Sequence, residues 1–136
     1  MNIELTDLQF RRLLDMVYIG NWILNATRGS DRILEYDDVE RELFSHCHSS
    51  GMSSLVEYTN GAAGPSSAFE NGGIHEAIAD YEDSVFFEIL AEELARRDMD
   101  FEAIGHENYI ELTNRIDEYI EEFEQNGIDN ITLDKK

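Results

Sequence analysis

The stretch ENYIELTNRIDEYIEEFEQ, residues 107–125, is the most clearly patterned segment of this 136-residue chain. Its apolar residues recur at steps of three and four and therefore fall on one side of a helix. They are Tyr109, Leu112, Ile116, Tyr119, Ile120 and Phe123. Asn126 and Gly127 follow as a helix C-terminus signal. The sequence predicts a helix over 106–125 whose narrow apolar seam packs into a core.

The preceding segment, 74–97, has a helical pattern whose apolar side changes along its length. Ile74 and Ile78 share one side of a helix, whereas Leu90 and Leu94 lie on nearly the opposite side. A straight helix with one face in solvent cannot bury both sets. The pattern therefore predicts either a break near residue 82 or a helix covered on both sides, and we favour the break.

Two further helices are expected near the N-terminus, over 7–27 and 37–49. Thr6 and Gln9 form a capping-box pattern at the start of the first. The apolar arc of that helix is broad, which predicts packing on more than one side. Gly20 in its middle costs about 1 kcal/mol relative to alanine, and we interpret it as a point of close approach by another helix.

Residues 49–73 differ in kind from the helical segments. They hold five glycines, six serines and the only proline, Pro65. We expect a long Gly/Ser-rich loop, of a length that is functional or disordered in most domains. Together the segments predict an all-α fold, a compact bundle of about four helices forming a single acidic domain over 1–136.

The charge of the chain restricts its partners. The formal net charge is −20, and residues 69–136 hold 20 of the 30 acidic residues against five basic ones. Such a field repels nucleic acid and anionic membrane surfaces and attracts basic proteins or cations. We therefore expect a basic protein as partner, with no direct nucleic-acid or membrane binding.

Cysteine content and the N-terminal residues bear on location. Cys47 is the only cysteine, so no disulfide forms within one chain. Residues 1–7 contain no basic residue and precede a segment too charged for a secretory signal. The longest apolar stretch, 16–24, is too short for a membrane span. These features predict a cytoplasmic protein.

The strongest candidate binding surface is the outer side of the helix over 106–125. Its acidic residues are Glu107, Glu111, Asp117, Glu118, Glu121, Glu122 and Glu124. They lie at about one per 4 Å of helix, whereas duplex DNA carries one charge per ~1.7 Å. One such helix is too dilute to imitate a duplex by itself. We expect this surface to dock a basic protein, with a merely solvated face as the alternative.

Motifs for metal binding and catalysis are weak. His46 and His48 form a tempting pair, but residues two apart on a helix point in nearly opposite directions. They could share a metal ion only if this stretch were extended, so they stay a weak alternative. No CxxC, HExxH, G-x-S-x-G or phosphate-loop pattern is present. We expect no metal, no cofactor and no catalytic residue.

The functional expectation is therefore a non-enzymatic interaction module that docks a basic protein, and a homodimer formed through an apolar side of the helix over 74–97 stays open. Three alternatives stay open. The first is an enzyme or small-molecule-binding protein with a site under the 49–73 loop, where His48, Tyr58, His75 and Asp80 would converge. The second is a nucleic-acid mimic that inhibits a nucleic-acid-binding protein. The third is acidity that serves only solubility or adaptation to salt.

Overall fold

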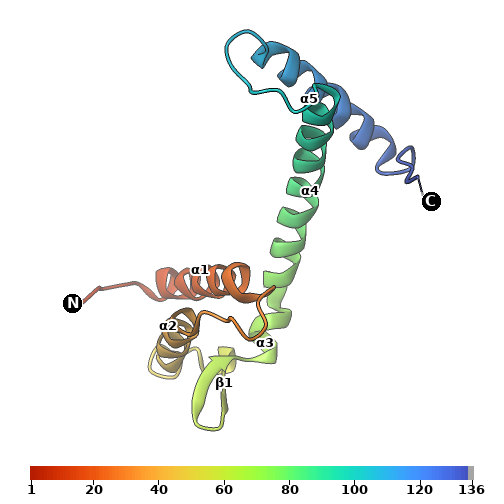
Figure 1. Cartoon of the computed structure of the whole chain (residues 1–136). Helices are drawn as coiled ribbons and strands as arrows, with labels where there is room; N and C mark the ends of the chain where they lie inside the picture. Colours follow the sequence, from red (N-terminus) through yellow and green to blue (C-terminus); the bar gives the residue numbers. More distant parts are fainter. Residues whose placement is uncertain (135–136) are drawn as a thin grey trace. The chain divides into compact units, whose positions relative to one another are not determined.

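The structure is a computed structural model, and it describes residues 1–134 (Figure 1). The predicted all-α class is confirmed, since four long helices make up most of the chain. These are α1 (Asp7–Asn25), α2 (Leu34–Ser45), α4 (His75–Asp98) and α5 (Tyr109–Asn126). Packing divides the chain into two compact units, Met1–Ile78 and Ala79–Lys136. The single domain expected over 1–136 stays a prediction.

Helix α1 begins as the capping box predicts. The Thr6 side chain accepts a hydrogen bond from the Gln9 backbone at 3.2 Å, and the Gln9 side chain accepts one from the Thr6 backbone at 2.9 Å. These two bonds satisfy backbone donors that no helical carbonyl can reach. The helix ends at Asn25, two residues before the predicted end.

Helix α2 begins at Leu34 rather than at residue 37 and ends at Ser45 rather than 49. Its start is fixed from outside the helix, because the Asn25 side chain hydrogen bonds to both the backbone N–H and the carbonyl of Ile33. Asp37 therefore lies inside the first turn, where its negative charge still interacts favourably with the helix dipole. The sequence pattern could not show this distant cap.

The stretch 49–73 is ordered and is not the long loop that was expected. A 3-10 turn (Ser53–Leu55) leads into an antiparallel hairpin of β1 (Val56–Thr59) and β2 (Ala62–Pro65). Asn60 and Gly61 form its turn, both with positive φ (53° and 80°). This is the two-residue turn whose twist matches paired strands, and Asn-Gly is its usual sequence.

A short helical connection joins the hairpin to α4. The Ser66 side chain caps α3 (Ser67–Phe69) by accepting from the Phe69 backbone at 3.2 Å. A π-helical turn follows over Glu70–Ile74, where Gly73 has a φ of 105°. Only glycine adopts this conformation readily, so the chain bends here.

Helix α4 is continuous from His75 to Asp98, and the predicted break near residue 82 is wrong. The apolar side changes along α4 because the first part of the helix packs into one core and the last part packs into another. Ile78 belongs to the core of the first unit, whereas Ala95 belongs to that of the second. The nearest bend in the backbone is the glycine turn before the helix.

Gly20 does not mark a contact within the described chain. A side-chain carbon added at this position would meet no atom within 4 Å. The predicted close approach at Gly20 is therefore wrong for the described residues. Around the helix, Leu14, Tyr18, Asn21 and Asn25 are buried, whereas Leu8, Met16 and Ile23 stay exposed. One side of α1 is covered, and another is open.

The first unit packs α1 and α2 side by side over the hairpin (Figure 1). Tyr18, Phe44 and Phe69 stack edge to face, with ring centres 5.1–5.2 Å apart. Such aromatic pairs add about 0.5–1.5 kcal/mol beyond the area they bury. The core is completed by Leu14, Cys47, Val56, Ala63, Ile74 and Ile78.

The second unit is built on the predicted seam of α5, except that the helix begins at Tyr109 rather than at 106 and Tyr109 itself is 60% exposed. Leu112 and Phe123 are buried, and the Phe123 ring lies 5.5 Å from that of Phe87 on α4. Ala95 and Met99 of α4 and its C-terminal turn pack against Leu112. The predicted C-cap is confirmed, since the Gly127 N–H donates to the Phe123 carbonyl at 2.9 Å.

Replacing Phe69 with alanine tests whether 49–73 is part of the core. Phe69 is fully buried, so we expect the free energy of unfolding to fall by about 3–5 kcal/mol. Urea unfolding followed by circular dichroism measures this loss. Thr59→Ala in the exposed end of the hairpin serves as the control. A loss below about 1 kcal/mol for Phe69→Ala would show that the stretch is not packed as described.

Candidate functional site

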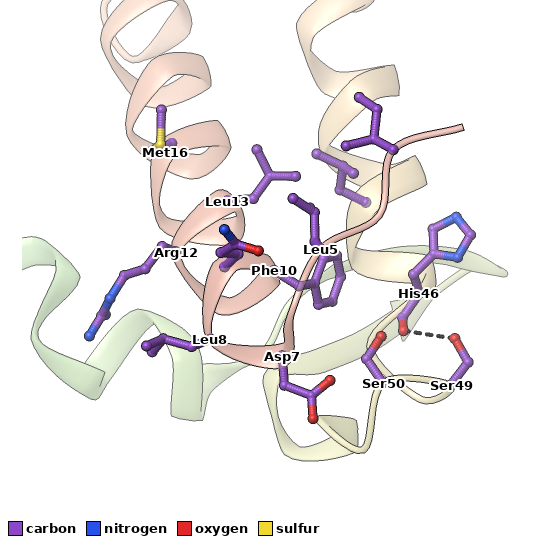
Figure 2. A pocket seen from close by; sticks show the side chains of 13 residues that line it. Leu5, Asp7, Leu8, Phe10, Arg12, Leu13, Met16, His46, Ser49 and Ser50 are labelled. Atoms are coloured by element: carbon purple, nitrogen blue, oxygen red, sulfur yellow. Dashed lines mark hydrogen bonds between the residues drawn. The ribbon is translucent and has the colours of Figure 1, made fainter. Parts of the chain in front are cut away.

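An open apolar groove runs between α1 and α2 in the first unit (Figure 2). Its volume is about 840 Å³, within the range of ligand and peptide sites. The walls come from the extended segment before α1, from α1 and from the C-terminal part of α2 with the turn that follows. The apolar lining residues are Ile3, Leu5, Leu8, Phe10, Leu13, Met16 and Leu43.

The start of α1 shapes one end of the groove. Leu5 precedes the capping residue Thr6, and Phe10 lies one turn into the helix, which is the spacing of a hydrophobic staple. Figure 2 shows Leu5 and Phe10 together in the middle of the groove. The staple directs the N-terminal segment along the groove, so that Ile3 becomes part of its wall.

Large apolar side chains in the groove remain open to solvent. Leu8 is 66% exposed and Met16 is 69% exposed. A contiguous apolar surface of this kind usually marks an interaction site, whereas scattered exposed apolar residues need no explanation. The groove is therefore a candidate interaction site.

Of the charged or ionisable groups at the rim of the groove, Arg12 and His46 have acidic neighbours, whereas Asp7 forms no ion pair within the described residues. Arg12 lies 3.2 Å from Asp15, which also binds Arg11. His46 lies 3.2 Å from Glu42. The surface that the groove offers is therefore mainly apolar.

The predicted acidic surface is largely retained on α5. Asp117, Glu118, Glu121 and Glu124 are exposed on the side of the helix opposite to its seam. No ion pair within residues 1–134 involves these four carboxylates. Glu107 is exposed as well, but it lies before the helix starts at Tyr109.

Two members of the predicted acidic set have internal partners. Glu111 forms an ion pair with Arg115 at 2.9 Å. Glu122 is half-buried and accepts hydrogen bonds from Asn126 and Asn130 near the helix C-terminus. Glu111 lies in the first turn of α5 and Glu122 near its end, and both carboxylates are already engaged within the chain, unlike the four exposed ones.

The structure does not bring His46 and His48 together at a metal site. Both follow the end of α2. His46 contacts Glu42, whereas His48 hydrogen bonds to the Ser53 hydroxyl at 2.7 Å and stacks on Tyr58 with ring centres 5.8 Å apart. Within residues 1–134, no group of three or more His, Cys, Asp or Glu side chains could hold a metal ion.

The four residues expected to converge under the 49–73 stretch do not form one site. His48 and Tyr58 form the stack just described, and Asp80 belongs to the second unit. His75 instead hydrogen bonds to the Tyr18 hydroxyl at 2.6 Å. A different set of polar groups surrounds a cavity of about 240 Å³ in the first unit: Tyr18, Asn21, Trp22, Asn25, Arg32, Glu40 and Glu70, with Ala26 and Pro65.

A buried hydrogen-bond network forms one wall of this cavity. The Asn21 amide donates to Asp37 at 3.0 Å and also to Glu40, and it accepts from Asn25 at 2.7 Å. Arg32 donates to both oxygens of Asp37, at 2.6 and 2.7 Å. Within the described residues, no buried side-chain polar atom lacks a partner. The network thus ties α1 to the start of α2.

Burial and neighbouring charges shift the pKa values of the ionisable groups around the cavity in different directions. The hydrogen bond from Arg32 is the main cause that lowers the pKa of Asp37 to about 2. Burial raises the pKa of Glu40 above its usual value. Burial, helped by the negative charges of Glu70 and Glu40, raises the pKa of Tyr18 to about 12. Asp37 is therefore well compensated by Arg32, whereas the Glu40 carboxylate is not fully compensated for its burial.

Cys47 and α4 carry two further features. Cys47 is fully buried, and burial raises the pKa of its thiol, which opposes formation of a nucleophilic thiolate.

On α4, Tyr81, Phe86 and Ile89 are 51–61% exposed, as an interface between copies would require. The homodimer stays a prediction.

Comparison of the chain with protein-family models, with curated proteins and with solved structures gave no match. In the described part of the chain, no helix has both the length and the apolar character needed to cross a membrane. Function must therefore be inferred from the surfaces described above.

Replacing Asp37 with asparagine tests the ion pair that supports the network. Because the folded pKa of Asp37 lies below its unfolded value, the pair stabilises the fold fully above about pH 4 and loses this effect as the pH falls towards about 2. Arg32 is 43% exposed, which weakens the pair. We expect a loss of roughly 1–2 kcal/mol in unfolding free energy near neutral pH.

The measurement is urea unfolding of the natural protein and Asp37→Asn at several pH values between about 7 and 2. The difference between them should shrink as the pH falls from about 4 to about 2. Asp38→Asn is the control, because Asp38 is 70% exposed and its pair with Arg41 should be worth less than about 1 kcal/mol. A difference that is constant over this pH range would contradict the electrostatic explanation.

Proposed function

We propose that this chain is a non-enzymatic interaction module that docks a basic protein, with the groove between α1 and α2 receiving apolar side chains of that partner. One observation carries the proposal: an open, apolar groove of about 840 Å³ exists in a chain whose net charge is −20. The combination favours a partner that is both basic and apolar. A basic amphipathic helix has this chemistry.

The groove is the source of affinity in this proposal. Burying an apolar side chain of the size of leucine yields about 1.5–3 kcal/mol. A few such anchors carry most of the binding energy in protein interfaces. The exposed side chains of Leu8 and Met16 would themselves be removed from water when a partner helix enters.

The carboxylates of α5 have a different role. Each exposed ion pair contributes little affinity, typically below 1 kcal/mol, because water and salt screen it. A face of like charges nevertheless attracts a basic partner and accelerates its approach. Asp117, Glu118, Glu121 and Glu124 form this face, which we name the acidic face of α5.

The groove also separates this proposal from mimicry of nucleic acid. A nucleic-acid-binding protein presents a surface suited to phosphates, which gains nothing from an apolar groove. The low charge density of a single helix opposes mimicry as well. A partner with apolar anchors explains both the groove and the charge.

Polar replacements in the groove test the apolar contribution. The probe is a labelled amphipathic helical peptide of lysine and leucine, and its binding is followed by fluorescence anisotropy. We expect Leu8→Asn with Met16→Asn to weaken binding about tenfold or more, because two apolar contacts are lost. Both residues are exposed, so the fold should tolerate the change.

The matched control is Ile23→Asn with Val39→Asn, which alters two apolar residues of similar exposure outside the groove. This double variant should bind the peptide like the natural protein. A second peptide, in which serine replaces every leucine, should bind much more weakly than the first. Equal weakening by both double variants would refute the groove as the docking surface.

Charge reversal tests the acidic face of α5. Asp117→Lys, Glu121→Lys and Glu124→Lys together should lower the affinity for the lysine–serine peptide about tenfold at low salt, and the loss should fade as salt rises. Glu122 is left unchanged because it accepts hydrogen bonds from Asn126 and Asn130.

The control for this variant reverses three exposed acids that are scattered over the chain, Glu4, Glu35 and Glu102. Both triple variants raise the net charge by the same amount. The scattered variant should lose less affinity, by a factor of about three or less, because its charges do not share a face. Equal losses would show that only the total charge matters and that α5 has no special role.

A further inference from the structure

The small cavity of the first unit is lined by an unusual combination of side chains. Two are aromatic, Tyr18 and Trp22, and two are carboxylates, Glu40 and Glu70. All four belong to the unit Met1–Ile78, and the cavity volume is about 240 Å³. This volume is below the range of typical drug-sized sites and suits a ligand of a few heavy atoms.

The charge of the cavity is negative once its internal pair is counted. Arg32 is the only basic residue in the lining, and its guanidinium binds both oxygens of Asp37. That pair is neutral as a whole. Glu40 and Glu70 form no ion pair within the described residues, so the cavity has two carboxylates without a cation of their own.

Glu40 is incompletely satisfied in its half-buried position. The Asn21 amide donates one hydrogen bond to it, whereas a carboxylate can accept about four. Withdrawing a carboxylate from water without a counter-charge is unfavourable. Burial is the main cause that raises the pKa of Glu40, and the negative charges of Asp37 and, less strongly, Glu70 act in the same direction. A bound cation would lower this cost for Glu40, whereas Glu70 is exposed and contributes a second negative charge to the lining.

The aromatic walls are held in place independently of any ligand. The Tyr18 ring packs edge to face on Phe69 and on His75, with centres 5.2 and 5.5 Å apart. Its hydroxyl is bound to His75 at 2.6 Å. Trp22 packs edge-on against the same histidine at 6.1 Å. Aromatic faces attract cations, tryptophan most strongly, so a cation that contacts the face of either ring would gain from it in addition to the carboxylates.

The kind of cation follows from the donors. A tightly held divalent metal needs several hard oxygen ligands around one point, and the described residues hold no group of three or more suitable side chains. An ammonium group needs only one or two acceptors and benefits from aromatic walls. The combination therefore favours an organic cation over a metal ion.

We propose that this cavity is a binding site for an organic ammonium ion, whose charge lies between Glu40 and Glu70 and whose carbon substituents contact Trp22 and Tyr18. Both a free small amine and the end of a lysine side chain have this chemistry. The site lies outside the groove and does not depend on the function proposed above, because none of the four side chains that define it lines that groove.

The chain contains its own reporter for this site, since Trp22 is its only tryptophan. Intrinsic fluorescence is measured during titration with ethylammonium chloride and, separately, tetramethylammonium chloride, against sodium chloride at equal ionic strength. We expect a saturable change with a dissociation constant of about 1–10 mM, which is the range open to so small a ligand. Magnesium and calcium chloride are titrated in parallel.

The source of the cation is distinguished by a third titration. Lysine blocked at its amino and carboxyl ends presents only its side-chain ammonium. Tighter binding of blocked lysine than of ethylammonium assigns the site to a lysine of a protein, whereas tighter binding of the small amines assigns it to a free amine. Either result supports the site.

Two variants and a control complete the experiment. Glu40→Gln and Glu70→Gln each remove one charge and keep the shape and the hydrogen-bond acceptor, and each should weaken ammonium binding about tenfold. Glu35→Gln, on the same helix as Glu40 but outside the cavity, should leave binding unchanged. Thermal unfolding in the presence of the ligand provides a second measurement, with stabilisation lost in the two cavity variants.

Three results would overturn the proposal. The first is a fluorescence change no greater with ammonium salts than with sodium chloride. The second is saturable binding of magnesium or calcium only. The third is undiminished ammonium binding by both cavity variants. Failure here leaves the groove unaffected, because the lysine–leucine peptide should bind Glu40→Gln and the natural protein equally well.

Discussion

The contact between the Asn25 side chain and the backbone of Ile33 is the constraint on which the first unit depends. Asn25 occupies both hydrogen-bonding groups of Ile33, the residue that caps α2, and so fixes where that helix begins. Because the bonds reach back from the end of α1, they also hold the two helices side by side. The apolar groove and the polar cavity are both formed by this pair of helices.

The same network explains why the two sites differ in chemistry. Asn21 and Asn25 are buried on α1, and a buried amide must find partners, which here are Asp37, Glu40 and each other. The polar groups therefore gather at one end of the helix pair. The remaining length of α1 offers apolar side chains, and where α2 does not cover them they line the groove. The two sites are separate results of one helix pairing.

The negative charge of the chain favours both proposed ligands, the basic protein and the cation, but it does not by itself select a binding site. The charge of −20 would attract a basic protein to the acidic face of α5, and it would also favour a cation in the cavity between Glu40 and Glu70. Charge alone does not select a site, because exposed carboxylates are solvated and each contributes little. A particular ligand is selected by the shape of a site and by the surface that is buried there, and the groove and the cavity provide both.

The sequence by itself determined the features that arise from neighbouring residues: the Thr6–Gln9 cap, the seam and C-cap of α5, and the exposed acidic face. The Asn60–Gly61 turn was equally local and would have revealed the hairpin. Only the tertiary structure decided that α4 is continuous, because its two apolar sides belong to two cores. It alone brought Tyr18, Glu40, Glu70 and Trp22 around one cavity, since contacts between residues far apart in the chain leave no periodic signal.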